Sequence, residues 1–582
     1  MRTSRSVLFH AATGILASIL GLACSPRNQD SNDAAATTHA PEAVPQVPAA
    51  TAREIDLFAF GAQQGYIAPC GCTTEPLGGL QYAVGYIDGA SNATARLILE
   101  PGSLLFPLPT DPEAPTDDAG WAQAQRRAAL LAERFSTWGN TAISGVGPSD
   151  VGSPLGGAAL TKFPLPRVLT NVQKDARPEN LLETATRSID GGQLKVRAWV
   201  VVDPTVTSEG LPPLTDPVAA LASARKTHAG TDATHLDIVV VHGARSLARR
   251  VATEVAGLDV VIVGGPQATT EGSRLGASPF QVGTTWVVEP GDRGQTLSHL
   301  TLSAPHDLKD PPFADSTRWQ FIPPIEQKRA ELKRLDDRIA SFSADPSADP
   351  SFVANLRAER ARVQAALRSN GPNDGVGLRL QQVKISCKLA PDAATTNALA
   401  AYDGWVAAEN SARFKNVFTP TPPKGAPTYV GKSTCEDCHD EAVEFWSSSH
   451  HASAYETLVD ANKQFDLSCV GCHVTGFKKP GGAHVVETRG LVDVQCEQCH
   501  GPGSLHADNP DPSNIQREVS PATCLQCHTP EHSDTFQLEA YLRNVLGKGH
   551  GEQARAALGP GPTGRELRAE GLAKAGGACK KM

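Results

Sequence analysis

The five-residue pattern Cys-x-x-Cys-His occurs four times between Cys435 and His528. It is the attachment motif of c-type haem, in which both thiols bond to the porphyrin and the adjacent imidazole binds the iron. Its repetition in one short stretch predicts four covalently attached haem c groups. The predicted attachment cysteines and iron ligands are Cys435, Cys438 and His439; Cys469, Cys472 and His473; Cys496, Cys499 and His500; and Cys524, Cys527 and His528.

Paired cysteines have two other common uses, which are zinc sites built from two Cys-x-x-Cys pairs and redox-active dithiols. Neither use requires a histidine directly after every second cysteine. Haem attachment therefore explains more of the repeated pattern than zinc or dithiol chemistry does.

The amino-terminal residues are typical of a bacterial signal sequence. Arg2 and Arg5 precede an apolar run over residues 7–22, which is too short to be interpreted first as a membrane-spanning helix. The run ends at Cys24 in a sequence that resembles the lipobox, although Gly21 stands where leucine is usual. We therefore expect lipidation of Cys24. The alternative is cleavage after Ala23, which would leave Cys24 as a spare thiol.

Composition, length and charge constrain the domain organisation and the class of partner. Residues 25–52 have low hydrophobicity and no periodicity, as expected for a flexible tether. At 582 residues the chain has room for several domains, and its net charge of −9 gives no reason to expect a nucleic-acid partner. The expected location is the periplasmic side of a bacterial membrane, with the lipid anchor as the only membrane contact and periplasmic or membrane redox proteins as partners.

Residues 53–308 alternate short apolar runs with amphipathic stretches, which favours a layered α/β domain. Apolar runs such as 194–202 and 236–241 predict buried strands, whereas 121–135 and 217–227 predict helices. The segment from Gly65 to Cys72, followed by Leu77-Gly-Gly-Leu80, resembles calcineurin-like metallophosphatases of the 5′-nucleotidase type. This resemblance implies α-β-β-α layers and a two-metal site at strand ends.

The metal ligands of that family are mostly replaced in this sequence. Gln63 stands in place of its Asp-x-His motif, Ser103 in place of an aspartate, and residues 264–268 in place of Gly-His-x-His. Asp150 and His242 alone match ligand positions, and two ligands do not hold a two-metal cluster. We therefore expect phosphatase activity to be lost.

Cys70 and Cys72 directly follow the first predicted strand of this domain. One interpretation is a redox or metal site at the mouth of the former active-site cleft. The other is a structural role, with one of the two cysteines bridged to Cys387 or Cys579 in an oxidising compartment. The sequence does not choose between them.

The rest of the chain divides into three parts. Residues 309–425 are predicted to form a helical hairpin and connector, because charged stretches with helical apolar spacing flank Ser-Ala-Asp-Pro repeats. Residues 426–556 are predicted to be a mainly α multihaem cytochrome domain whose core is the porphyrins themselves. Residues 557–582 are expected to be a polar tail.

Distal iron ligands are predicted from a second resemblance. The histidine of His451-Ala-Ser-Ala, the segment from Cys499 to His506, and Gly549-His550-Gly551 are similar to parts of the tetrahaem cytochrome c-554 family. The resemblance implies that His451, His506 and His550 are distal ligands and that the second haem, attached beside His473, is five-coordinate. His484 is an alternative cap for that iron, with His532 in reserve; for these two and for His450, a surface or propionate-binding role is favoured.

These features predict a tetrahaem cytochrome that transfers electrons between periplasmic redox partners. The alternative is a redox enzyme that uses one five-coordinate haem on a small nitrogen or oxygen species, since the c-554 family takes part in ammonia oxidation. A haem-bearing phosphohydrolase is disfavoured by the replaced metal ligands.

Overall fold

The computed structural model describes residues 52–576 and Cys579, with gaps at residues 70–71, 91–94, 110–113, 190–193, 207, 229–234, 266–274, 306–312, 314–315, 324, 345–348, 369–375 and 531. The predicted signal sequence, the lipidation candidate Cys24, the tether and Cys70 therefore lie outside the described residues.

The first of two sheets in the amino-terminal domain has eight strands in the order β13-β14-β12-β1-β2-β3-β4-β5. The strands β1 to β5 run parallel, whereas β12 runs antiparallel to both β1 and β14. The strands are β1 (Ala52–Ala59), β2 (Arg96–Glu100), β3 (Ala142–Ser144), β4 (Arg167–Val168), β5 (Leu181–Leu182), β12 (Thr296–Pro305), β13 (Trp319–Phe321) and β14 (Val376–Lys384).

The second sheet has six strands in the order β10-β11-β9-β8-β7-β6. Its four central strands are parallel, and both edge strands pair antiparallel. The strands are β6 (Ala185–Ile189), β7 (Leu194–Val202), β8 (His235–His242), β9 (Val260–Val263), β10 (Phe280–Val282) and β11 (Thr285–Val288). The run Ile238 to Val241 of β8 is apolar at every position because parallel strands are covered on both faces.

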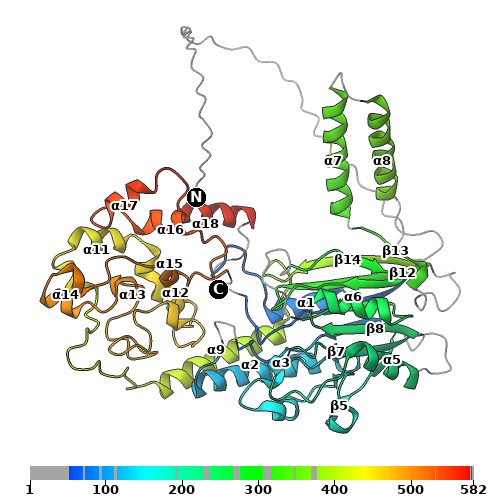
Figure 1. Ribbon diagram of the computed structural model, residues 1–582, viewed down its shortest axis with the longest axis horizontal. Helices are drawn as coiled ribbons and strands as arrows, with labels where there is room; N and C mark the ends of the chain where they lie inside the picture. The colour runs from blue at the N-terminus through cyan, green and yellow to red at the C-terminus, as the bar shows by residue number, and fades with distance from the viewer. Residues whose placement is uncertain are drawn as a thin grey trace, which may run out of the picture. The chain divides into compact units, whose positions relative to one another are not determined.

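The two sheets face each other across an aliphatic core, and helices cover their outer faces (Figure 1). The core between the sheets includes Leu57 of β1, Leu99 of β2 and Val240 of β8. The helices α1 (Leu80–Ala90), α2 (Asp118–Ser136) and α9 (Ala393–Arg413) pack on the first sheet, and α5 (Pro217–Thr227) and α6 (Arg245–Glu254) pack on the second. This arrangement confirms the predicted α-β-β-α sandwich.

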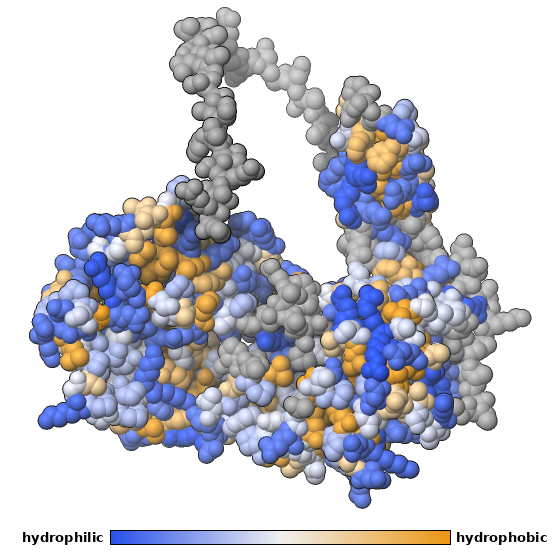
Figure 2. All heavy atoms as spheres, viewed as in Figure 1, coloured by the Kyte–Doolittle hydropathy of each residue, from blue (hydrophilic) through white to orange (hydrophobic). Residues whose placement is uncertain are grey.

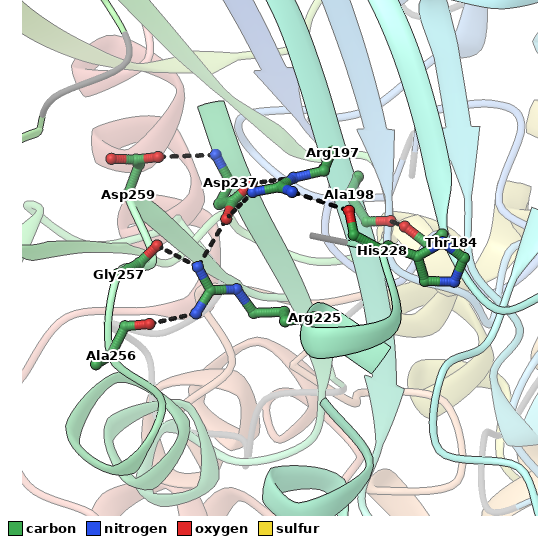
Figure 3. A network of polar contacts seen from close by, with 9 residues as sticks. All are labelled: Thr184, Arg197, Ala198, Arg225, His228, Asp237, Ala256, Gly257 and Asp259. Carbon is green, nitrogen blue, oxygen red and sulfur yellow. Dashed lines mark hydrogen bonds and ion pairs between the residues drawn. The ribbon is translucent and has the colours of Figure 1, made fainter. Parts of the chain in front are cut away.

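A buried carboxylate ties the second sheet to one of its helices (Figure 3). Asp237 on β8 accepts 2.8 Å hydrogen bonds from Arg197 on β7 and from Arg225 near the end of α5. The backbone N–H of Asp237 in turn donates to Asp259 at 2.7 Å. Burial raises the pKa of Asp259 to about 6, because an ionised carboxylate loses solvation there. Since these groups satisfy one another, the network has a structural role.

The sandwich continues beyond residue 308, where its predicted boundary lies. The hairpin helices α7 (Ile325–Ser343) and α8 (Pro350–Arg368) form as expected and lie side by side (Figure 1). They are inserted between β13 and β14, however, and β14 then returns to the first sheet. After it, α9 packs on α1 and α2. Residues 376–413, predicted as connector, therefore belong to the sandwich.

The carboxy-terminal region consists of short helices and turns. Its helices are α10 (Lys432–Glu436), α11 (Asp440–Ser447), α12 (Ala454–Asp460), α13 (Cys496–His500), α14 (Ser504–Asp508), α15 (Pro521–Cys524), α16 (Leu538–Val545), α17 (Glu552–Ala557) and α18 (Gly564–Lys574). Within the residues that the structure describes, no helix has the length and hydropathy needed to cross a bilayer. The predicted polar tail contains α18, which packs on α16 through Tyr541 and Gly564.

Polar contacts and one disulfide join the sandwich to the carboxy-terminal region. Gln123 of α2 donates to Asp466 at 2.6 Å, and Lys478 forms an ion pair with Asp117 at 2.6 Å. The disulfide links Cys387, just after β14, to Cys579 near the end of the chain. Cys387 is therefore bridged to Cys579 and not to Cys72.

Candidate haem-binding site

Each Cys-x-x-Cys-His motif folds as a single helical turn. In the first motif, the backbone N–H groups of Cys438 and His439 both donate to the carbonyl of Cys435, at 3.3 and 2.9 Å. Side chains three residues apart share one face of such a turn, so the two thiols point the same way. The other three motifs also form short turns, on the segments 470–472, α13 and α15. This local geometry suits attachment of both thiols to one porphyrin edge.

Three of the four motif histidines face a second histidine from elsewhere in the sequence. The rings pair across distances between centroids that differ little among the three sites. The pairs are His439 with His506 at 6.3 Å, His528 with His451 at 6.3 Å, and His500 with His550 at 5.9 Å.

This separation is the one that two axial imidazoles on one iron require. A metal–nitrogen bond is about 2.0 Å long and the nitrogen lies about 1.1 Å from its ring centre, so the two centroids should be about 6.2 Å apart. Two imidazoles in direct stacking contact would lie closer than this. The space between the paired rings therefore fits an iron atom with one ligand on each side.

Second contacts orient the rings for this role. The Nδ1 atoms of several predicted ligands face an oxygen atom, which leaves Nε2 as the ligating nitrogen. These contacts are His473 to the Ala454 carbonyl (2.5 Å), His500 to the Gln516 carbonyl (2.8 Å), His506 to the Asp511 carbonyl (3.1 Å), His550 to the Val545 carbonyl (2.8 Å) and His528 to the Ser533 hydroxyl (3.0 Å).

Burial keeps several of these imidazoles uncharged. It lowers the pKa of His528 to about 4, and the neighbouring His451 adds to the effect. Burial also lowers the pKa of His451 and of His500 from the ordinary value. Because iron binds the neutral ring, these shifts favour ligation at neutral pH.

His473 has a different environment from the other three motif histidines. The ring contacts of the described residues give it no imidazole partner of the kind found at the other three motifs. Its Nδ1 lies 2.5 Å from the Ala454 carbonyl and 3.4 Å from the Thr457 hydroxyl. Burial would lower the pKa of His473, but hydrogen bonds with the Cys72 thiol and with Ala454 raise it above its usual value. A thiol of the sandwich domain thus reaches this ring.

The other histidines considered as possible ligands lie outside these three ring pairs. His484 is buried, with its ring centre 5.0 Å from that of Phe414 and 6.5 Å from that of Phe477. His532 is close enough to interact electrostatically with Cys472. His450 begins the turn that carries His451.

The attachment motifs of different predicted haems approach one another in pairs. Cys496 of the third motif raises the pKa of the Cys435 thiol of the first, and Cys527 of the fourth raises the pKa of the Cys472 thiol of the second, so each pair of thiols lies close together. The third and fourth motifs are also close, since Cys499 interacts electrostatically with Cys524. A groove of about 450 Å³ lies beside Cys499, a volume in the range of ligand-binding sites.

Large apolar side chains reach the surface of this region (Figure 2). Val459, Leu505 and Leu525 are 49 %, 37 % and 52 % exposed. Exposed apolar residues of this size are costly in water, and porphyrin faces would cover apolar surface here. The chemistry of the thiols, the paired rings and the apolar surface together fit covalently bound haem.

Asp150 and His242, the two residues that match metal-ligand positions in the sequence, are both buried and held by other contacts. Asp150 accepts hydrogen bonds from the backbone N–H groups of Ser103 (2.8 Å) and Leu105 (2.9 Å), and Arg167 lies 3.5 Å from the same carboxylate. Burial lowers the pKa of His242 to about 4. Among the described residues, no cluster of three or more His, Cys, Asp or Glu side chains is placed to hold a metal ion.

Comparison with known proteins agrees with the resemblance to the cytochrome c-554 family. The sequence profile of the family described as "Cytochrome c554 and c-prime" matches residues 434–501. The cytochrome c-554 of Nitrosomonas europaea is 35 % identical over 91 residues, a match that covers 13 % of this chain and 39 % of the relative. The carboxy-terminal region is similar to cytochrome c-554. This similarity implies covalent haem c in that region.

Two solved structures share features of the sandwich. A 5′-nucleotidase precursor from Thermus thermophilus matches with a TM-score of 0.40 and 15 % identity, covering 63 % of this chain and 61 % of the other. A putative 5′-nucleotidase from Staphylococcus aureus matches with a TM-score of 0.38 and 11 % identity, covering 70 % of this chain and 66 % of the other. The description of the fold rests on the strand order given above.

Sequence reasoning missed two features of these sites. Arg167 lies buried beside Asp150, and its place in a two-residue strand leaves no periodic signal. The approach of Cys72 to His473 has no local signal either, because the two residues are far apart in the sequence. The odd number of cysteines that remains once the haem motifs are excluded is the available hint.

Proposed function

We propose that this chain is an exported, lipid-anchored tetrahaem c-type cytochrome that transfers electrons between periplasmic redox partners. The observation that carries the proposal is the set of three histidine pairs at 5.9–6.3 Å, each joining a motif histidine to a distal one. Two imidazoles on one iron suit electron transfer, because the ligand set does not change when the iron is reduced.

We infer an order for the electron path from the proximity of the motifs. The first and third haems would be neighbours through Cys435 and Cys496, and the second and fourth through Cys472 and Cys527. The electrostatic interaction of Cys499 with Cys524 supports a link between the two pairs. The path is then first, third, fourth and second haem, so that electrons enter and leave at opposite ends of the series.

The proposal is tested on the purified holoprotein by counting haem and following its reduction. We expect four haems per chain by the pyridine haemochromogen assay and a mass increase of four haems on the intact polypeptide. A redox titration should show reversible reduction of all four. Fewer than four covalent haems, or loss of reversibility, would contradict the proposal.

Anchoring rests on the sequence around Cys24. A lipoprotein should incorporate radiolabelled palmitate in a bacterial host, and Cys24→Ser should abolish labelling while leaving the haem content unchanged. Label retained in Cys24→Ser would contradict this anchor.

A second candidate function is favoured by the environment of His473, which lacks an imidazole partner among the described rings. A redox enzyme would bind a small nitrogen or oxygen species at this iron. Such an enzyme should bind one carbon monoxide per chain in the ferrous state.

A phosphohydrolase is the least favoured function, since Asp150 is already held by backbone N–H groups and Arg167. Phosphoester turnover with stoichiometric manganese would overturn that judgement.

A further inference from the structure

The spacer of the third haem motif carries a buried carboxylate. Glu497 directly follows Cys496 and is only 2 % exposed, although glutamate is rarely buried. One of its oxygen atoms accepts hydrogen bonds from the backbone N–H groups of Gly503 at 2.7 Å and Val430 at 2.9 Å. The other oxygen accepts from the N–H of Gly431 at 2.8 Å. These partners are all donors, which is the arrangement that an ionised carboxylate takes.

The same carboxylate is tied to the first motif. Gly431, which donates to Glu497, directly precedes α10, and its carbonyl accepts from the Cys435 thiol at 3.7 Å. The Glu497 charge acts on that thiol, since it adds to the effects of Cys496 and of burial that raise the pKa of Cys435. Glu497 is therefore linked through Gly431 to the attachment point of the first haem, and through its peptide bond to that of the third.

The charge of Glu497 is not neutralised by the groups that hold it. In the described part of the chain these groups are backbone N–H donors, which carry no net charge. Lys432, which follows Gly431, instead places its ammonium 5.6 Å from the centre of the Trp446 ring. The negative charge thus lies in a region shielded from water, where electrostatic interactions are stronger than at the surface.

The corresponding position in the other three motifs differs. It is occupied by Glu436 in the first motif, Val470 in the second and Leu525 in the fourth. Glu436 has the same side chain but is exposed, so that water and salt screen its charge. The buried charge at this position is therefore specific to the third motif, beside the first.

We propose that Glu497 lowers the reduction potentials of the first and third haems and so sets the direction of electron flow. The inference rests on the proposed function, because it requires all four haems. A nearby negative charge favours the ferric state, which carries one more positive charge than the ferrous state. The first and third haems therefore form the low-potential half of the series.

Electrons move spontaneously from lower to higher potential. In the order first, third, fourth and second haem, they would enter at the first haem from a reduced redox partner and leave at the second. Each step oxidises one ferrous iron and reduces the next ferric iron by one electron, and no bond forms or breaks.

The test is a redox titration of the full-length holoprotein followed by electron paramagnetic resonance. The axial ring planes meet at 20° at the first haem, 88° at the third and 46° at the fourth. Near-parallel and near-perpendicular imidazoles give different g values, so the signals of these haems can be followed separately. In wild type we expect the first and third haems to be reduced at lower potentials than the fourth.

Glu497→Gln removes the charge and keeps one acceptor oxygen. At a fixed potential, the ratio of ferrous to ferric iron at the first and third haems should rise roughly tenfold, which corresponds to about 59 mV for a one-electron couple. The fourth haem should not change. Glu497→Asp keeps the charge and should keep the wild-type ratios, which separates the effect of charge from that of geometry.

The matched control is Glu436→Gln, which removes an exposed charge at the same position of the first motif. Its ratios should change by less than about twofold. Four haems per chain and unchanged g values would show that each variant is folded. If Glu497→Gln does not acquire four haems, the order of potentials in wild type and the ratios in Glu497→Asp decide.

Three results would overturn the inference. The first is a wild type in which the first or third haem is reduced at a higher potential than the fourth. The second is a Glu497→Gln variant whose ratios match those of wild type or of Glu436→Gln. The third is an equal shift in Glu497→Asp and Glu497→Gln. Fewer than four covalent haems in wild type would instead overturn the tetrahaem proposal, and this inference with it.

Discussion

The sandwich and the haem-binding region solve the problem of a stable core in different ways. The sandwich buries aliphatic strands such as β8 between two sheets and under helices. The haem-binding region has short helices and one small apolar cluster around Val470 and Val485. The apolar side chains of the sandwich form its core. The haem-binding region is instead expected to pack around its haem groups. A chain of this kind should therefore respond to cofactor loss in one region and to side-chain truncation in the other.

The largest expected effect follows from withholding haem. If the chain is produced without haem attachment, residues 428–556 should lose their ordered structure, because the missing groups are the core of that region. Limited proteolysis with mass spectrometry should show cleavage throughout this segment, while the sandwich remains protected. Equal protection of both regions from protease in the haem-free chain would contradict a core that depends on haem.

A smaller effect is expected from truncating the aliphatic core. Leu57 is fully buried between the sheets, so Leu57→Ala should lower the free energy of unfolding of the sandwich by about 2–5 kcal/mol. Hydrogen exchange in β1 and β8 measures the change, and the haem absorbance should be unaffected. Leu182→Ala is the control, since Leu182 is 42 % exposed and its loss should change stability by less than about 0.5 kcal/mol.

The sandwich should also depend on pH through Glu100. Burial first, and then the nearby Asp150, raise the pKa of Glu100 to about 8. Between pH 4.5 and 8 the folded protein keeps this proton while the unfolded chain releases it, so stability falls as the pH rises, by about 1.4 kcal/mol per pH unit. Glu100→Gln should remove that fall, as measured by urea unfolding at several pH values.

The control for this experiment is Glu133→Gln, whose side chain is 66 % exposed beside Arg134. Its stability should follow that of wild type across the same pH range. A constant difference between Glu100→Gln and wild type at every pH would contradict a raised pKa.

The smallest effect concerns the contact between the two regions. Thr74→Val removes a hydroxyl that donates to Asp534, and hydrogen bonds to a charged group contribute about 1.5–3 kcal/mol. Because the Thr74 backbone N–H still donates to Asp534, we expect the free energy of local opening to fall by about 1.5 kcal/mol. Hydrogen exchange in the loop that carries Thr74 should become correspondingly faster. Thr227→Val, which loses only an exposed bond within α5, is the control. Equal hydrogen-exchange rates in this loop for the two variants would mean that the Thr74–Asp534 contact does not stabilise the packing of the sandwich on the haem-binding region.

Local patterns predict much of this molecule. The i, i+3 cysteines of each motif define a helical turn, and apolar runs such as β8 define buried strands. Two further local signals mark elements that the predictions above leave out. Val376, Leu378 and Leu380 alternate as in a half-buried strand, and Thr563 with Glu566 forms the capping box that begins α18.

Other features depend on contacts between distant residues. Nothing in the sequence near His439 indicates that His506, and not His451 or His550, faces it. The same holds for the disulfide, because a cysteine near the end of a chain has many partners open to it until the fold selects one. Pairing of this kind is decided by tertiary packing.

The disulfide between Cys387 and Cys579 closes a covalent ring that contains all four haem motifs. Cys387 is synthesised 192 residues before its partner, so the ring closes only after the last motif has been made. A chain in which the ring is still open has the Cys387 thiol available to thiol reagents, whereas a chain in which the disulfide has formed does not. Pulse labelling with a maleimide would time ring closure against the attachment of each haem, and a single protease cut inside the ring would leave both pieces joined until a reductant is added.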